Sequence, residues 1–93
     1  MSQSLALDPV LDLKAAAPLR AALLDRRGEA LTIDASAVQR LGGLCLQVLL
    51  GARRAWAEDG RSLEVTPRSA AFDEALGLFG AADRFGERSG DGA

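Results

Sequence analysis

The chain has 93 residues, of which 48% are apolar and 26% are charged, and its formal net charge at pH 7 is −2. This length and balance are typical of one globular domain with a hydrophobic core and argue against extensive disorder. A net charge so close to zero provides no long-range attraction to nucleic acid or to an anionic membrane. We therefore expect neither of them as a partner.

Two residue counts limit the chemistry that the chain can perform. It has no histidine and one cysteine, Cys45. Without histidine it lacks the commonest general base and the commonest metal ligand, and a lone cysteine cannot close an internal disulfide or hold zinc by itself. No pair of a nucleophile and a base is evident in the sequence. We expect no catalytic residues, no metal and no cofactor.

The sequence also bears on where the protein works. Residues 1–10 have neither the basic flank nor the long apolar run of a signal peptide. The longest apolar stretch, Leu41 to Ala52, is shorter than the roughly 20 residues that span a bilayer. The simplest expectation is a cytoplasmic, reducing location without insertion into a membrane.

Strand and helix patterns alternate in the first part of the chain. Segment 5–10 is a short apolar stretch that contains Pro9, and it predicts an edge strand or an extended lead-in. Segment 15–27 predicts a helix, since it is rich in Ala, Leu and Arg, and Gly28 ends it. Segment 30–36 alternates apolar and polar residues and predicts a buried strand.

The strongest helical pattern covers residues 41–58 and is ended by Gly60. Its apolar residues recur at helical spacing, which predicts an inward face. This inward stripe comprises Leu41, Leu44, Cys45, Val48, Leu49, Ala52 and Trp56. Within it we expect Cys45 to be a buried structural thiol and Trp56 to anchor the core or a subunit contact.

A last strand and helix complete the domain. Segment 62–66 alternates like a strand, and Thr66 followed by Pro67 predicts the cap and first residue of a helix that runs to about Arg84. We expect this helix to turn four residues inward, namely Phe72, Ala75, Leu76 and Phe79. We expect one domain over residues 1–86 and a flexible tail over residues 87–93.

The order strand, helix, strand, helix, strand, helix predicts an α/β domain with a small, mainly parallel sheet flanked by helices. Segments 11–19 (LDLKAAAPL), 31–38 (LTIDASAV) and 60–80, in this order and spacing, resemble the STAS domain. That fold occurs in anti-sigma factor antagonists and in small subunits of several bacterial complexes. The resemblance covers about four-fifths of the chain, and the family's first β-hairpin is shortened here.

The resemblance implies a regulatory protein–protein interaction module and no enzymatic activity. Counted without gaps from Asp34, the family's D-S-S-G-L motif falls on residues 42–46, which read Gly-Gly-Leu-Cys-Leu. The serine that a partner kinase phosphorylates in classical members falls on Gly43, and the next position is Leu44. Because neither has a hydroxyl, we expect no phosphorylation there. Segment 41–47 is most similar to small STAS proteins encoded beside bacterial chemotaxis genes.

The start of the main helix is the candidate partner-binding face. Gly42 and Gly43 are compatible with a tight turn, with close approach of a partner, or with an anion held by free N–H groups. On a helical wheel Leu46 and Leu50 lie outside the inward stripe, where a docked partner, flanking helices or the second subunit of a homodimer would cover them. The expected partner-binding residues are Gly42, Gly43, Leu46, Gln47, Leu50 and Arg54.

Asp12, Asp34 and Ser36 could suggest a metal or catalytic cluster, but we interpret them as solvated turn residues at strand ends. Two functions remain open. One is a signalling adaptor or antagonist that binds a histidine-kinase-like or chemotaxis component. The other is a STAS subunit that binds the other subunits of a lipid-trafficking ABC transporter. A nucleotide-binding module is a weaker third, because Gly42 and Gly43 would be its only phosphate cradle.

Overall fold

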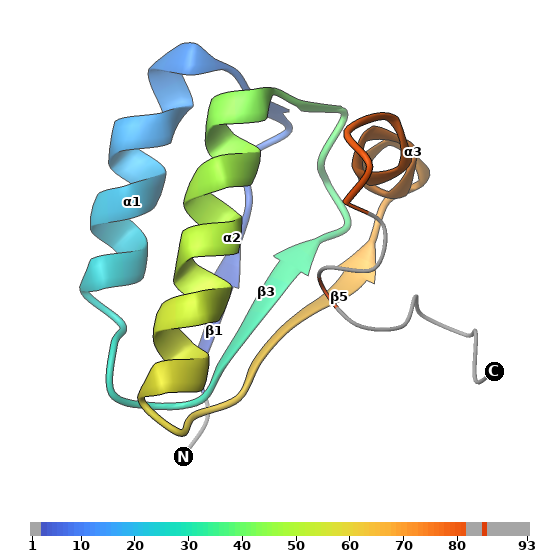
Figure 1. Cartoon of the computed structure of the whole chain (residues 1–93). Helices are drawn as coiled ribbons and strands as arrows, with labels where there is room; N and C mark the ends of the chain where they lie inside the picture. Colours follow the sequence, from blue (N-terminus) through green and yellow to red (C-terminus); the bar gives the residue numbers. More distant parts are fainter. Residues whose placement is uncertain (1–2, 82–84, 86–93) are drawn as a thin grey trace, which may run out of the picture.

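The computed structural model of the chain describes residues 3–81 and 85. Its centre is a parallel sheet in the order β1–β3–β5, and two helices lie side by side over one face of it, with a third beyond the end of β5 (Figure 1). The strands are β1 (Gln3–Ala6), β3 (Leu31–Ala35) and β5 (Leu63–Arg68), and the helices are α1 (Ala16–Leu24), α2 (Gly43–Glu58) and α3 (Ala70–Leu78). The predicted α/β class with a mainly parallel sheet is confirmed. The predicted tail, residues 87–93, lies outside the described residues.

A second, two-stranded parallel sheet joins β2 (Val10–Leu11) to β4 (Arg40–Leu41). The prediction that the main helix includes Leu41 is therefore wrong. Leu41 is buried in β4, and the chain then turns at Gly42, whose N–H donates to the carbonyl of Leu11 at 2.9 Å. The apolar run alone did not separate strand from helix, because both elements bury leucine.

The first helix is shorter than predicted and is preceded by a 3₁₀ turn, η1 (Leu13–Ala15). The side chain of Asp12 caps this turn by accepting hydrogen bonds from the backbone N–H groups of Lys14 and Ala15. Helix α1 ends at Leu24, and Gly28, with φ of 104°, makes the left-handed turn toward β3. The predicted boundaries thus included the turns at both ends of the helix.

The start and end of the last helix differ from the prediction. Thr66 and Pro67 belong to β5, and Ser69 is the cap: its Oγ accepts from the Phe72 N–H at 3.0 Å and donates to the Val38 carbonyl at 2.6 Å. This second bond fixes the cap to the chain after β3, which local sequence could not reveal. The helix ends at Leu78, well before Arg84.

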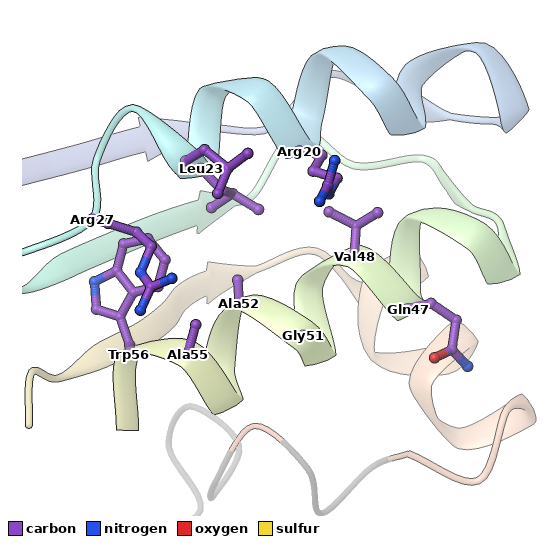
Figure 2. Close-up of a pocket in the computed structure, with 10 residues that line it drawn as sticks. Arg20, Leu23, Arg27, Gln47, Val48, Gly51, Ala52, Ala55 and Trp56 are labelled. Atoms are coloured by element: carbon purple, nitrogen blue, oxygen red, sulfur yellow. The ribbon is translucent and has the colours of Figure 1, made fainter. Parts of the chain in front are cut away.

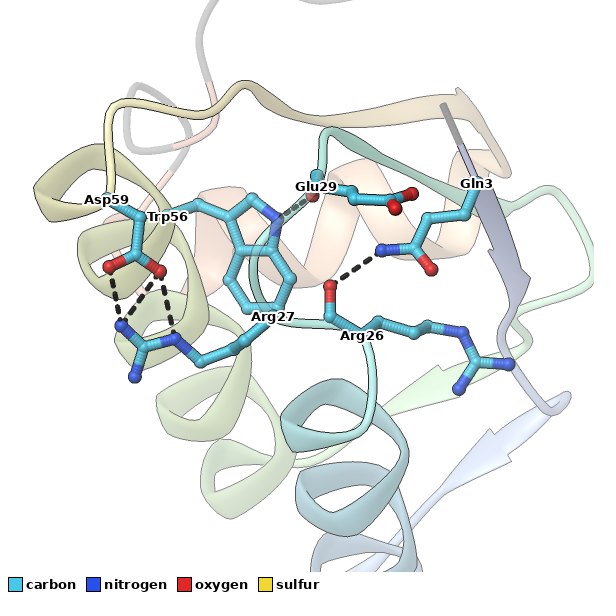
Figure 3. A network of polar contacts seen from close by, with 6 residues as sticks. All are labelled: Gln3, Arg26, Arg27, Glu29, Trp56 and Asp59. Carbon is cyan, nitrogen blue, oxygen red and sulfur yellow. Dashed lines mark hydrogen bonds and ion pairs between the residues drawn. The ribbon is translucent and has the colours of Figure 1, made fainter. Parts of the chain in front are cut away.

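The core lies between the sheet and helices α1 and α2, and it contains most of the side chains predicted for it, but not Leu44 or Phe79. Trp56 is 1% exposed, and its indole N–H donates to the Glu29 carbonyl at 2.8 Å (Figure 3). Beside it, Arg27 and Asp59 form a two-pronged ion pair that joins the ends of α1 and α2, with a closest distance of 2.8 Å. The prediction that Trp56 anchors the core is confirmed.

The side chain of Arg68 is almost fully buried and connects Phe85 to the sheet. It is 2% exposed, its Nη2 donates to the carbonyl of Phe85 at 2.9 Å, and its Nε donates to that of Val65 at 2.9 Å. Asp73 on α3 is its ionic partner at 3.5 Å. These bonds satisfy a guanidinium that would otherwise be costly to bury.

Candidate functional site

Helix α2 is rotated relative to the predicted orientation at its N-terminal end. Cys45, Leu49 and Trp56 are buried as expected, but Leu44, predicted inward, is 50% exposed. Leu46, predicted outward, is 3% exposed and belongs to the core. The outward position of Leu46 is thus a wrong prediction. A helical wheel assumes that a helix buries one face only. Here a second segment, the residues that follow α3, lies near α2 on the side of Leu46.

This second segment creates a surface groove of about 470 Å³ along the first half of α2. We call it the α2–α3 groove. Its lining residues are Gly43, Leu44, Leu46, Gln47, Leu50, Phe79, Gly80 and Ala81. Four of the six predicted partner-binding residues therefore line one groove, with Leu46 as a buried part of its wall and Leu50 partly buried against the core.

The two most exposed apolar side chains of the groove were not predicted as site residues. Leu44 and Phe79 are each 50% exposed, although the helical pattern placed both inward. Phe79 follows the last residue of α3. The predicted helical pattern extended beyond this end and therefore placed Phe79 on the inward face. Exposed leucine and phenylalanine at the rim of a groove are typical of a protein-binding surface.

The two glycines at the start of α2 have different roles. A Cβ on Gly42 would lie 3.1 Å from the carbonyl oxygen of Leu11, closer than an ordinary contact, so glycine leaves room for the close approach of Leu11. A Cβ on Gly43 would lie 3.6 Å from the Phe79 ring, an ordinary van der Waals distance. Gly42 therefore serves the turn, whereas Gly43 is exposed and leaves the backbone open beside Phe79.

Gln47 lies between the α2–α3 groove and a second hollow of about 380 Å³ between α1 and α2 (Figure 2). In the second hollow Arg20 reaches from α1 toward Val48, and the indole of Trp56 closes the far end. Arg54, the sixth predicted site residue, is exposed and lines neither hollow. The structure does not bring it together with the four predicted residues that line the groove, and Gly42 is not part of the groove lining either.

The polar residues at the turns carry structural bonds. The Ser36 hydroxyl and N–H both donate to Asp34 Oδ1, at 2.6 and 2.9 Å, and hold the pKa of that carboxyl below its ordinary value. Burial raises the pKa of the Cys45 thiol, as does the negative charge of nearby Asp12. Cys45 Sγ donates to the Asp12 carbonyl at 3.3 Å. Asp12 and Ser36 lie at turns as predicted, whereas Asp34 lies in β3, one residue before the strand ends. The prediction of a buried thiol is confirmed.

Comparison with known families gives one finding. The family model described as "Mlab, STAS domain" matches residues 2–86. The chain belongs to the STAS domain family. STAS domains are in general regulatory or interaction modules that bind other proteins, and not enzymes. No curated protein matched the chain. Within the described residues, none of the helices is both long enough and apolar enough to cross a membrane.

Proposed function

We propose that this STAS domain is a cytoplasmic module that binds another protein through the α2–α3 groove and uses no phosphorylation at the start of α2. One observation supports the proposal above others: Leu44 and Phe79, each half exposed, stand beside the open backbone of Gly43. A partner side chain gains apolar contact with both, and the missing Cβ of Gly43 allows its backbone to approach.

The absence of a hydroxyl distinguishes this groove from one controlled by phosphorylation. Residues 42–46 contain no serine or threonine. A phosphate would add a charge of about −1.5 to −2 beside an apolar rim and would oppose docking there. Binding at this groove would therefore be constitutive, set by the concentrations of the two proteins.

The pathway that we propose is chemotaxis, two-component or anti-sigma-type signalling, with a histidine-kinase-like or chemotaxis component as the partner. The resemblance of segment 41–47 to STAS proteins encoded beside chemotaxis genes supports it. The same groove would serve a STAS subunit of a lipid-trafficking ABC transporter, whose other subunits would then be the partners. The identity of the captured protein distinguishes the two pathways.

Affinity capture from the native cells tests the proposal. The full chain is compared with Leu44→Asp, in the groove, and with Leu24→Asp, at the end of α1, because Leu24 and Leu44 are 52% and 50% exposed. We expect the full chain and Leu24→Asp to retain the same protein and Leu44→Asp to lose it. Equal retention by both variants, or equal loss, would contradict the proposed role of the groove.

A further inference from the structure

Strand β1 leaves one edge of the main sheet open. Among the described strands only β3 pairs with it, so β1 lies at an edge of the sheet (Figure 1). The N–H groups of Gln3 and Leu7 donate to carbonyls on the β3 side, at 3.2 and 2.9 Å. Because backbone groups alternate in direction along a strand, the N–H and C=O groups of Ser4 and Ala6 point toward the open edge.

Apart from its short length of four residues, this edge lacks the features that normally prevent strands from pairing with other chains. Natural edge strands carry lysine, proline or a bulge, or are covered by another element. Here residues 3–7 read Gln-Ser-Leu-Ala-Leu, without charge or proline, and Asp8 and Pro9 follow only where the strand has ended. Gln3 uses its side chain within the chain, since its Nε2 donates to the Arg26 carbonyl (Figure 3).

An apolar hollow accompanies the open edge. It measures about 170 Å³ and lies where β1 and the chain after it face α1. Its lining is mainly apolar and comprises Leu5, Ala6, Leu7, Asp8, Leu11, Ala15, Pro18, Leu19 and Ala22. Recognition by strand addition needs unpaired backbone groups for affinity and an adjacent pocket for every second side chain. The β1 edge offers both.

We propose that β1 pairs antiparallel with β1 of a second copy of this chain, which joins the two sheets into one continuous sheet. With the two-fold axis at Leu5, Ser4 of each copy faces Ala6 of the other, and all four outward backbone positions form hydrogen-bonded pairs. The two Leu5 side chains then meet beside the hollows of both copies. In this register the outward N–H and C=O groups of one copy pair with those of the other. No charged residue lies within residues 3–7 to oppose the pairing.

Light scattering coupled to size exclusion, with the full chain up to millimolar concentration, tests the pairing. We expect the mass to rise toward twice that of the monomer. Ser4→Pro removes an outward N–H and keeps the backbone bonds to β3, and proline is tolerated at such positions of edge strands. It should therefore nearly keep the thermal unfolding midpoint and weaken dimerisation at least tenfold. Ser4→Ala keeps that N–H and should dimerise like the unmodified chain. A monomer at every concentration, or a dimer unchanged in Ser4→Pro, would overturn the proposal.

Cross-linking gives a second measurement that does not depend on the proline variant. In Leu5→Cys the two thiols face each other across the axis, and mild oxidation should produce a covalent dimer rapidly. Leu24→Cys is the control, because Leu24 is half exposed on α1, and Cys45 is buried in both variants. Cross-linking of Leu5→Cys no faster than of Leu24→Cys would refute the pairing of β1 with β1.

Discussion

A charge placed at Leu44 should disturb binding far more than folding. Leu44 is 50% exposed, so an aspartate there loses about half of the roughly 1.5–3 kcal/mol that a fully buried leucine contributes. It also lies in the first turn of α2, where a carboxylate gains about 0.3–1 kcal/mol from the helix dipole. We expect Leu44→Asp to lower the free energy of unfolding by no more than about 1 kcal/mol. In a docked groove it should cost about 2 kcal/mol or more, roughly a 30-fold loss of affinity.

Leu46→Asp is the matched control, two residues along the same helix. Leu46 is 3% exposed, so the variant buries an unpaired carboxylate, which should cost more than about 4 kcal/mol. A 93-residue domain has about 5–14 kcal/mol of stability in total. Urea unfolding followed by circular dichroism measures both variants, and titration against the captured partner measures binding. Similar unfolding midpoints for the two variants would refute the rotation of α2 described here.

Three further predictions concern the same end of α2. Cys45 should react slowly with a thiol reagent until denaturant is added, because it is fully buried and its raised pKa lowers the thiolate fraction; rapid labelling would contradict this. Gly42→Ala should cost about 1–3 kcal/mol in urea unfolding through contact with the Leu11 carbonyl, whereas Gly43→Ala should be neutral or slightly stabilising. The intact mass of protein from its own cells should show no stoichiometric phosphate; a phosphate on Ser36 would mean that a switch exists elsewhere.

The order of elements was predictable because each buried element keeps its own period. Within segment 30–36, residues 31–36 alternate strictly, and Leu31–Ala35 form β3 with Leu31, Ile33 and Ala35 buried. The stripe along α2 placed Cys45 and Trp56 correctly. These patterns predict burial correctly where one face of a helix packs on one face of the sheet, and most of the domain is built in this way.

The candidate site was predicted only in part, because it lies where a third element reaches α2. Leu46 belongs to the core and lines the same groove as residues 79–81, which are more than thirty positions away in the sequence. Leu44 and Phe79 are exposed because each lies at the end of a helix, where the buried face of that helix ends. Local sequence contains no signal for the position of a segment that is so distant along the chain. The helical wheel therefore predicted the helix correctly but assigned the wrong residues to its buried side.

The boundary errors have a similar cause. Strands β2 and β4 have two residues each, too few for any alternation to show. Ser69 replaces Thr66 as the cap of α3 because its hydroxyl also donates to the Val38 carbonyl. Arg68 gave no signal of burial, since its partners on α3 and at Phe85 come together only in the folded chain. Each case depends on a tertiary contact that local residue preference does not contain.

The two surfaces proposed here can be occupied at the same time. The sheet order β1–β3–β5 places the open edge of β1 beside α1, whereas the α2–α3 groove lies toward the β5 side of the domain (Figure 1). No residue lines both the groove and the hollow next to β1. A dimer joined through β1 would therefore carry two grooves, one at each end of the continuous sheet, and would present two partner molecules in a fixed two-fold arrangement. Pairing at the edge would then add avidity for a partner that is itself dimeric, without any change at the groove.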